Sequence, residues 1–107
     1  MSSPRNFLYR FPRFEAHNRV DFIHHDNVLL GYCTEISESG LRGAFSDTAL
    51  PGTEGLITLY RNDQSFCAHA MILEVHENEA TARFQFQSLQ EENAIREFIR
   101  LLAPSEF

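Results

Sequence analysis

The feature of this sequence that most constrains its fold is a period-two alternation of apolar and polar residues, which begins at Val20 and ends at Phe86. Alternation at this period places apolar side chains on one face of a β-strand and polar side chains on the other. Polar or Pro-Gly turn residues divide the alternation into six short runs: Val20–Phe22, Val28–Ile36, Gly40–Phe45, Gly55–Tyr60, Phe66–Val75 and Glu79–Phe86.

The faces of the last run show how the strands are expected to pack. One face is apolar and the opposite face is polar, formed respectively by Ala80, Ala82, Phe84 and Phe86, and by Thr81, Arg83 and Gln85. A sheet with one buried and one solvated face is typical of antiparallel pairing. Because no helical pattern separates the six runs, the sequence predicts an all-β fold, a closed or nearly closed six-stranded antiparallel barrel.

The hydrophobic period changes after this barrel. Ser88 and Glu91 have the spacing of a capping box, in which the serine oxygen accepts from a free N–H and the glutamate reaches back to the cap. Beyond them, apolar residues recur at helical spacing: Ala94, Ile95, Phe98, Ile99 and Leu102. We therefore predict a C-terminal helix from about residue 88 to 102. Residues 1–13 follow neither period, which predicts an arm over 1–13 and a single barrel-and-helix domain over 14–107.

Charge divides the chain near the same place. The formal net charge is −6, and all nine basic residues are arginines. Residues 1–19 carry +3, whereas residues 20–107 carry −9. Such an acidic body disfavours a protein that coats a nucleic acid polymer, since that function needs a broad basic surface. The arginine-rich start still suits one compact anion, because guanidinium binds phosphate bidentately and stacks on rings.

Other properties of the sequence indicate a single cytoplasmic domain. Its 107 residues can bury one core, and no apolar run approaches the roughly 18 residues of a membrane span. The first residues have no apolar segment typical of a secretory signal. Cys33 and Cys67 lie far apart inside apolar runs, which favours two buried free thiols. We expect no membrane insertion.

The sequence contains no pattern that indicates catalysis or a metal site. Neither a nucleophile elbow nor a glycine-rich phosphate loop is present. His24 and His25 are adjacent, so on a strand they point to opposite faces and cannot chelate one ion together. His69 and His76 fall in a strand and its turn, where exposed histidines are common. We therefore predict that the protein is not an enzyme and requires no cofactor.

Two segments stand out as candidates for binding. The first is the arginine arm Arg5–Arg13, and the second is Glu35–Arg42, which joins two strands and offers a carboxylate, a hydroxyl and a glycine. A carboxylate can accept the donors on the Watson–Crick edge of guanine, and arginine is the usual partner of guanine N7 and O6. A guanine nucleotide with two negative charges would suit both segments.

At these residues the sequence resembles the PilZ family of bacterial cyclic di-GMP receptors. That family pairs an Arg-x-x-x-Arg arm with an [Asp/Asn]-x-Ser-x-x-Gly turn, on a six-stranded barrel followed by a helix. Here the turn motif matches at Ser37 and Gly40, with Glu35 in the Asp/Asn position. The arm departs from the pattern: a motif ending at Arg13 has Tyr9 in the first position, and one ending at Arg10 has Asn6 there.

The resemblance implies a signalling domain that binds cyclic di-GMP and relays it by a change in the arm. Arg5, Arg10 and Arg13 would then contact phosphates and guanine faces. Glu35 and Ser37 would read a guanine edge, and Gly40 would allow close backbone approach. A downstream protein partner is expected, and formation of a homodimer is compatible with the resemblance. The alternative is a degenerate PilZ domain that binds no nucleotide and acts as a protein–protein adaptor, its arm lying over the acidic barrel.

Overall fold

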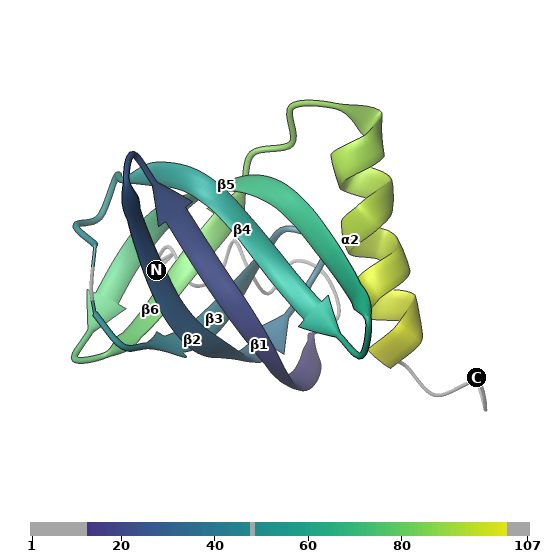
Figure 1. Ribbon diagram of the computed structural model, residues 1–107, viewed down its shortest axis with the longest axis horizontal. Helices are drawn as coiled ribbons and strands as arrows, with labels where there is room; N and C mark the ends of the chain where they lie inside the picture. The colour runs from purple at the N-terminus through teal and green to yellow at the C-terminus, as the bar shows by residue number, and fades with distance from the viewer. Residues whose placement is uncertain (1–12, 48, 103–107) are drawn as a thin grey trace, which may run out of the picture.

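The computed structural model describes residues 13–47 and 49–102, which form six strands and one helix (Figure 1). The elements are β1 (Phe14–His24), β2 (Asn27–Ile36), β3 (Gly40–Phe45), β4 (Glu54–Arg61), β5 (Gln64–His76), β6 (Glu79–Phe84) and α2 (Leu89–Leu102). Every strand pairs antiparallel with both neighbours, in the closed order β1-β2-β3-β6-β5-β4. The predicted six-stranded antiparallel barrel with a C-terminal helix is therefore confirmed.

Three connections in the barrel are tight hairpins with two-residue turns, at the polar breaks that the sequence predicts. The first residue of each turn has a positive φ: 52° at His25, 54° at Asn62 and 56° at Glu77. A side chain in this region costs about 1 kcal/mol, which the flanking strand ladders offset. The link between β2 and β3 differs, because Ser37–Ser39 form a longer turn there.

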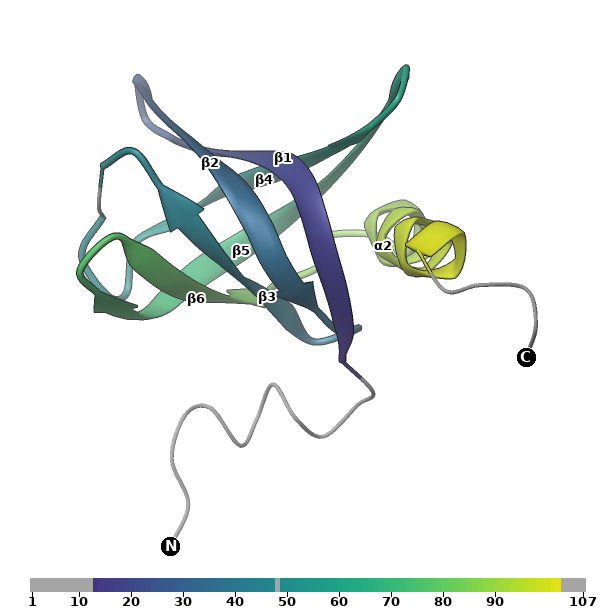
Figure 2. The same cartoon turned by 90° about the horizontal axis from the view of Figure 1, so that it is seen from below.

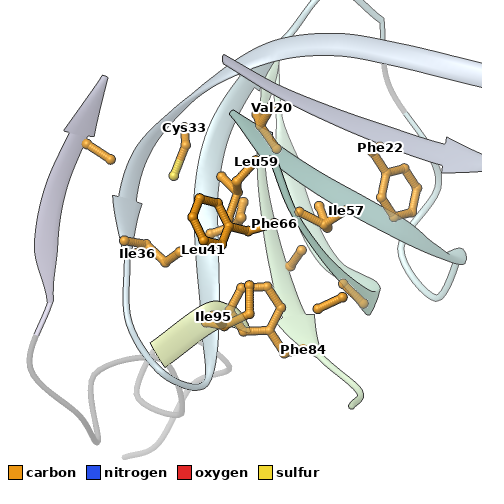
Figure 3. Close-up of a cluster of buried hydrophobic side chains, with 14 of the residues drawn as sticks. Val20, Phe22, Cys33, Ile36, Leu41, Ile57, Leu59, Phe66, Phe84 and Ile95 are labelled. Carbon is orange, nitrogen blue, oxygen red and sulfur yellow. The ribbon is translucent and has the colours of Figure 1, made fainter. Parts of the chain in front are cut away.

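One hydrophobic core fills the barrel (Figure 3). Its inner strand positions include Phe22, Ile57 and Leu59, which have no exposed surface. The helix α2 lies beside the barrel next to β5 (Figure 2) and contributes Ile95, Phe98 and Ile99 to the core. The Phe98 ring meets Phe66 of β5 edge to face, with centroids 5.4 Å apart. Burial of this apolar stripe stabilises α2 against the strands.

The start of α2 follows the predicted capping box in part. Ser88 Oγ accepts a hydrogen bond from Glu91 N at 3.2 Å, as expected. The Glu91 carboxylate reaches one residue further back than predicted, accepting from Gln87 N at 3.1 Å. It also accepts from His69 N at 3.0 Å and lies 2.7 Å from His69 Nδ1. Glu91 therefore joins α2 to β5 as well as capping the helix.

The strands differ from the predicted runs most at the start of β1, and other strand ends differ by one or two residues. β1 begins at Phe14, earlier than the alternation suggests, because a bulge between Glu15 and Asn18 shifts the period while pairing with β2 continues. β6 ends at Phe84, two residues before the predicted end. Phe86 still stacks on Phe84, with ring centroids 5.4 Å apart.

Two burial predictions are wrong. Cys67 is exposed, because the alternation that turns Phe66 and Ala68 inward turns Cys67 outward, whereas Cys33 is buried as predicted. Thr81, expected on the solvent face, is buried. It pairs with Arg42 of β3 and Glu74 of β5, and the long side chains of both line a small pocket with it.

Candidate functional site

The β2–β3 turn is braced by the two serines within it. Ser37 N donates to the carbonyl oxygen of Gly40 at 2.8 Å, and Ser39 N donates to Ser37 Oγ at 3.2 Å. The two hydroxyl oxygens lie 3.1 Å apart, so they share a hydrogen bond. Both serines are buried, and Phe84 N of β6 donates to Ser39 O at 2.9 Å. The sequence thus folds this turn into a fixed shape at the start of β3.

Glu35 lies between two arginines beside this turn. Arg13 Nη1 lies 3.5 Å from Glu35 Oε2, and Arg42 Nη1 lies 3.4 Å from Glu35 Oε1. The β2–β3 register places Arg42 directly opposite Glu35, and the β1–β2 register places Glu15 on its other side. The charges of Arg13, Arg42, Glu35 and Glu15 sum to zero, so the two guanidinium groups can face an anion only when Glu35 has another partner.

One oxygen of Glu35 is short of hydrogen bonds. Glu35 Oε1 is buried and accepts no hydrogen bond within residues 13–47 and 49–102, although Arg42 lies near it as an ion-pair partner. An ion pair at this distance satisfies the oxygen less well than a charge-assisted hydrogen bond would. The site therefore contains a carboxylate oxygen that a ligand donor would satisfy.

The pocket formed here is small, with a volume of about 10 Å³. It is lined by Arg13, Glu35, Ile36, Ser37, Gly40, Leu41 and Arg42, which we call the turn site. A pocket of this size holds at most one water molecule. A larger ligand must consequently lie over the turn site and compete with the pairing of Arg13 and Glu35.

The turn site collects four of the six residues predicted from the sequence: Arg13, Glu35, Ser37 and Gly40. Arg5 and Arg10 lie outside the described residues. Sequence reasoning missed Arg42, although the spacing of the β2–β3 hairpin held a signal for it. Closing that hairpin around Ser37–Ser39 brings Glu35 and Arg42 onto paired positions.

A salt bridge links the turn to the helix. Glu38, the exposed residue between the two serines, lies 3.4 Å from Arg96 Nε of α2. Arg96 also donates to Glu92 on the same helix at 2.9 Å. Both partners are about half exposed, so the expected contribution is small.

A second polar cluster lies on the outer face of β1 and β4. Tyr60 Oη donates to the buried Asp21 carboxylate at 2.9 Å, and this hydrogen bond raises the pKa of Tyr60. Arg19 lies 3.4 Å from Asp21 and 4.8 Å from the centre of the Tyr60 ring. These contacts satisfy the buried Asp21, which indicates a structural role for the cluster.

The thiol of Cys33 lies behind the turn site and donates to Glu35 O at 3.4 Å. Burial raises the pKa of Cys33 to about 12, so it is an inert thiol. Among the described residues, no three His, Cys, Asp or Glu side chains gather closely enough to hold a metal ion. In the same part of the chain, no helix has the length and apolar character needed to cross a membrane.

A sequence profile for the PilZ domain matches residues 8–103. The chain belongs to the PilZ domain family. The resemblance carried by Ser37 and Gly40 is thereby confirmed. The match covers the β2–β3 turn, Arg10 and Arg13 of this PilZ domain, and begins after Arg5. No curated protein matches its sequence.

Solved structures share the fold of this PilZ domain. The PilZ domain of YcgR from Escherichia coli, solved with c-di-GMP, has a TM-score of 0.74 and 15% identity, covering 87% of this chain and 89% of that one. The PilZ domain of CeSA from a cellulose-synthesizing bacterium has a TM-score of 0.70 and 17% identity, covering 85% and 94%. An uncharacterized Legionella protein has a TM-score of 0.60 and 18% identity, covering 86% and 94%. At such identities the likeness shows the fold.

Proposed function

We propose that this PilZ domain binds cyclic di-GMP over the turn site and relays binding through the arm of residues 1–13, which precedes a barrel-and-helix domain over 14–107. The observation that carries the proposal is the buried Glu35 Oε1 without a hydrogen-bond donor. The Watson–Crick edge of guanine presents N–H donors, which a carboxylate accepts. A guanine edge on Glu35 would therefore remove an unfavourable feature of the ligand-free site.

The roles proposed for the other residues of the site follow from their chemistry. Arg13, about half exposed beside Glu35, would contact a phosphate or the face of a guanine, with Arg5 and Arg10 assisting from the arm. The Ser37 hydroxyl already forms hydrogen bonds within the turn. Its main role would therefore be to fix the backbone conformation of the turn beneath the ligand. Gly40 would admit the ligand close to the backbone.

Binding would free Arg13 from Glu35 and redirect it to the ligand. Arg13 is the last residue of the arm, so this exchange would change the posture of residues 1–13 and offer a different surface to a downstream protein. The domain would act as a receptor in the bacterial cytoplasm, without catalysis of its own. A homodimer is compatible with this scheme.

The second candidate function is an adaptor that binds no nucleotide, and one observation favours it. Three large apolar side chains on the outer face of β2 are exposed: Val28 by 53%, Leu30 by 49% and Tyr32 by 64%. Leu30 and Tyr32 border a groove of about 480 Å³ beside Arg19. Contiguous exposed apolar surface is typical of protein contacts.

Calorimetric titration with cyclic di-GMP, combined with amide NMR spectra, separates the two functions. A receptor gives heat and amide shifts at Ser37–Gly40 with ligand at roughly 100 μM, since signalling affinities are micromolar or better. Cyclic di-AMP is the matched control ligand, because adenine has an acceptor where guanine presents N1–H. Absence of both heat and shifts with cyclic di-GMP would leave the adaptor function.

A further inference from the structure

We infer that Arg42 is a ligand-binding residue of the turn site, and that Arg13 and Arg42 together bind the phosphates of the dinucleotide. The inference rests on the proposed function and adds a residue of β3 to it. It assigns one arginine to the arm side of Glu35 and one to the barrel side.

The strand register fixes the position of Arg42. Its residue pairs with Glu35 across β2 and β3, and its Nη1 lies 3.4 Å from Glu35 Oε1. The Arg42 side chain is 20% exposed, compared with 49% for Arg13, so it is held mainly by the surface of the barrel. Both arginines line the same pocket. A guanidinium held on a strand loses little conformational freedom when it binds a ligand.

The geometry around Glu35 suits a ligand with two anionic groups. Each oxygen of the carboxylate faces one guanidinium, and Glu15 lies opposite Glu35 on β1. When Glu35 accepts hydrogen bonds from guanine, both guanidiniums face ligand atoms. Cyclic di-GMP has two phosphodiesters with one negative charge each, and a planar guanidinium binds each phosphate through paired N–H donors.

Arg42 also supplies a cation in the register of the arm motif that ends at Arg13. With Arg13 as the last residue of the arm motif, Tyr9 replaces the first arginine, and the site lacks one cation. Arg42 is a second cation beside the same carboxylate, supplied by the barrel.

Titrations of the full chain with cyclic di-GMP test this assignment. We expect Arg42→Ala to weaken binding about 10- to 100-fold, which is the loss of one charge-assisted contact. Arg42→Lys keeps the charge without the planar fork, and should fall between the wild type and Arg42→Ala. The matched control is Arg61→Ala, at the end of β4, a strand that borders neither β2 nor β3. It should change affinity less than about twofold.

A double-mutant cycle separates contact with the ligand from positioning of Glu35. In a Glu35→Gln background, a phosphate contact predicts that Arg42→Ala weakens binding by a further factor of about 10. If Arg42 only orients the Glu35 carboxylate, the second change has no effect and the inference is overturned. Wild-type affinity in Arg42→Ala also overturns it while the receptor function stands. A wild-type chain that binds no cyclic di-GMP overturns both.

Discussion

Two glutamates of this PilZ domain, Glu35 and Glu91, each belong to a short sequence motif, but their surroundings in the structure differ. Glu91, at the start of α2, accepts hydrogen bonds from two backbone N–H groups and lies 2.7 Å from a histidine nitrogen. We call Glu91 with His69, Gln87 and Ser88 the helix joint. Glu35, in the turn site, faces two guanidiniums at 3.4–3.5 Å, and its Oε1 accepts no hydrogen bond within the described residues.

The difference between the two carboxylates indicates different functions. At the helix joint the donors come from the backbone and are fixed by the fold, so the carboxylate connects two elements of structure. At the turn site the partners are charged side chains, and one carboxylate oxygen accepts no hydrogen bond within the described residues. A saturated carboxylate therefore stabilises the fold, whereas an unsaturated one beside arginines favours ligand binding.

The largest expected effect comes from Glu35→Ala. It should lower the affinity for cyclic di-GMP about 100-fold, or about 2.7 kcal/mol, because the acceptor for guanine is lost. The free energy of unfolding should change by less than about 0.5 kcal/mol, since the substitution also removes a buried oxygen without a hydrogen bond and the repulsion between Glu35 and the facing Glu15. Calorimetry and urea denaturation measure the two quantities.

The matched control for this change is Glu38→Ala, which removes the same charge from the same turn. Glu38 is exposed and contacts Arg96 rather than Glu35's partners. Its loss should reduce affinity less than about threefold. Equal losses for the two variants would show that general charge, rather than the Glu35 carboxylate, determines binding.

Glu91→Ala should give the opposite pattern. Loss of its hydrogen bonds at the helix joint is expected to lower the free energy of unfolding by about 2 kcal/mol, with affinity for the ligand unchanged. Urea denaturation measures the change. Glu92→Ala, one residue along α2, removes only an exposed pair with Arg96 and should cost less than about 0.5 kcal/mol. A loss at Glu92 as large as that at Glu91 would contradict the role assigned to the joint.

The helix joint and the turn site differ in how far the sequence predicts them. Alternation of apolar and polar residues is local, so it predicts the six strands, and Gly40–Phe45 is predicted to the residue. The capping box is likewise local, and Ser88 occupies its expected role. The second partner of Glu91, His69, lies 22 residues away, and only the packing of α2 on β5 brings the two together.

The parts of the site that sequence did not predict depend on register and on neighbouring side chains. Closing the β2–β3 turn pairs Glu35 with Arg42, but the bulge between Cys33 and Glu35 breaks the alternation just beyond this pair, and alternation alone does not indicate a bulge. The burial of Thr81 depends in the same way on the long side chains of the strands beside it. The arm arginines Arg5 and Arg10 remain a prediction.

The helix joint should also give a pH dependence. Burial opposes ionisation of Glu91, but the backbone N–H groups of His69 and Gln87 outweigh it, and the pKa of Glu91 is lowered from its ordinary value of 4.5. The folded state then binds fewer protons than the unfolded state, so this stabilisation is present above about pH 5 and is lost as the pH falls below 4.5. The stability difference between wild type and Glu91→Gln should shrink between pH 5 and about pH 3 in urea titrations. A difference that is constant over this range would contradict the assignment.

The smallest effect is expected at the contact between the two regions. Glu38 and Arg96 join the turn to α2 at 3.4 Å, but both side chains are about half exposed and the geometry is long for a hydrogen bond. Arg96→Ala should therefore lower the free energy of unfolding by less than about 0.5 kcal/mol and change ligand affinity less than twofold. In about 1 M salt, wild type and variant should have the same stability, because salt screens the ion pair. Denaturation and calorimetry at low and high salt test this. A tenfold change in affinity would mean that α2 and the turn site respond to ligand as one unit, and the division between a structural and a ligand-binding carboxylate would then fail.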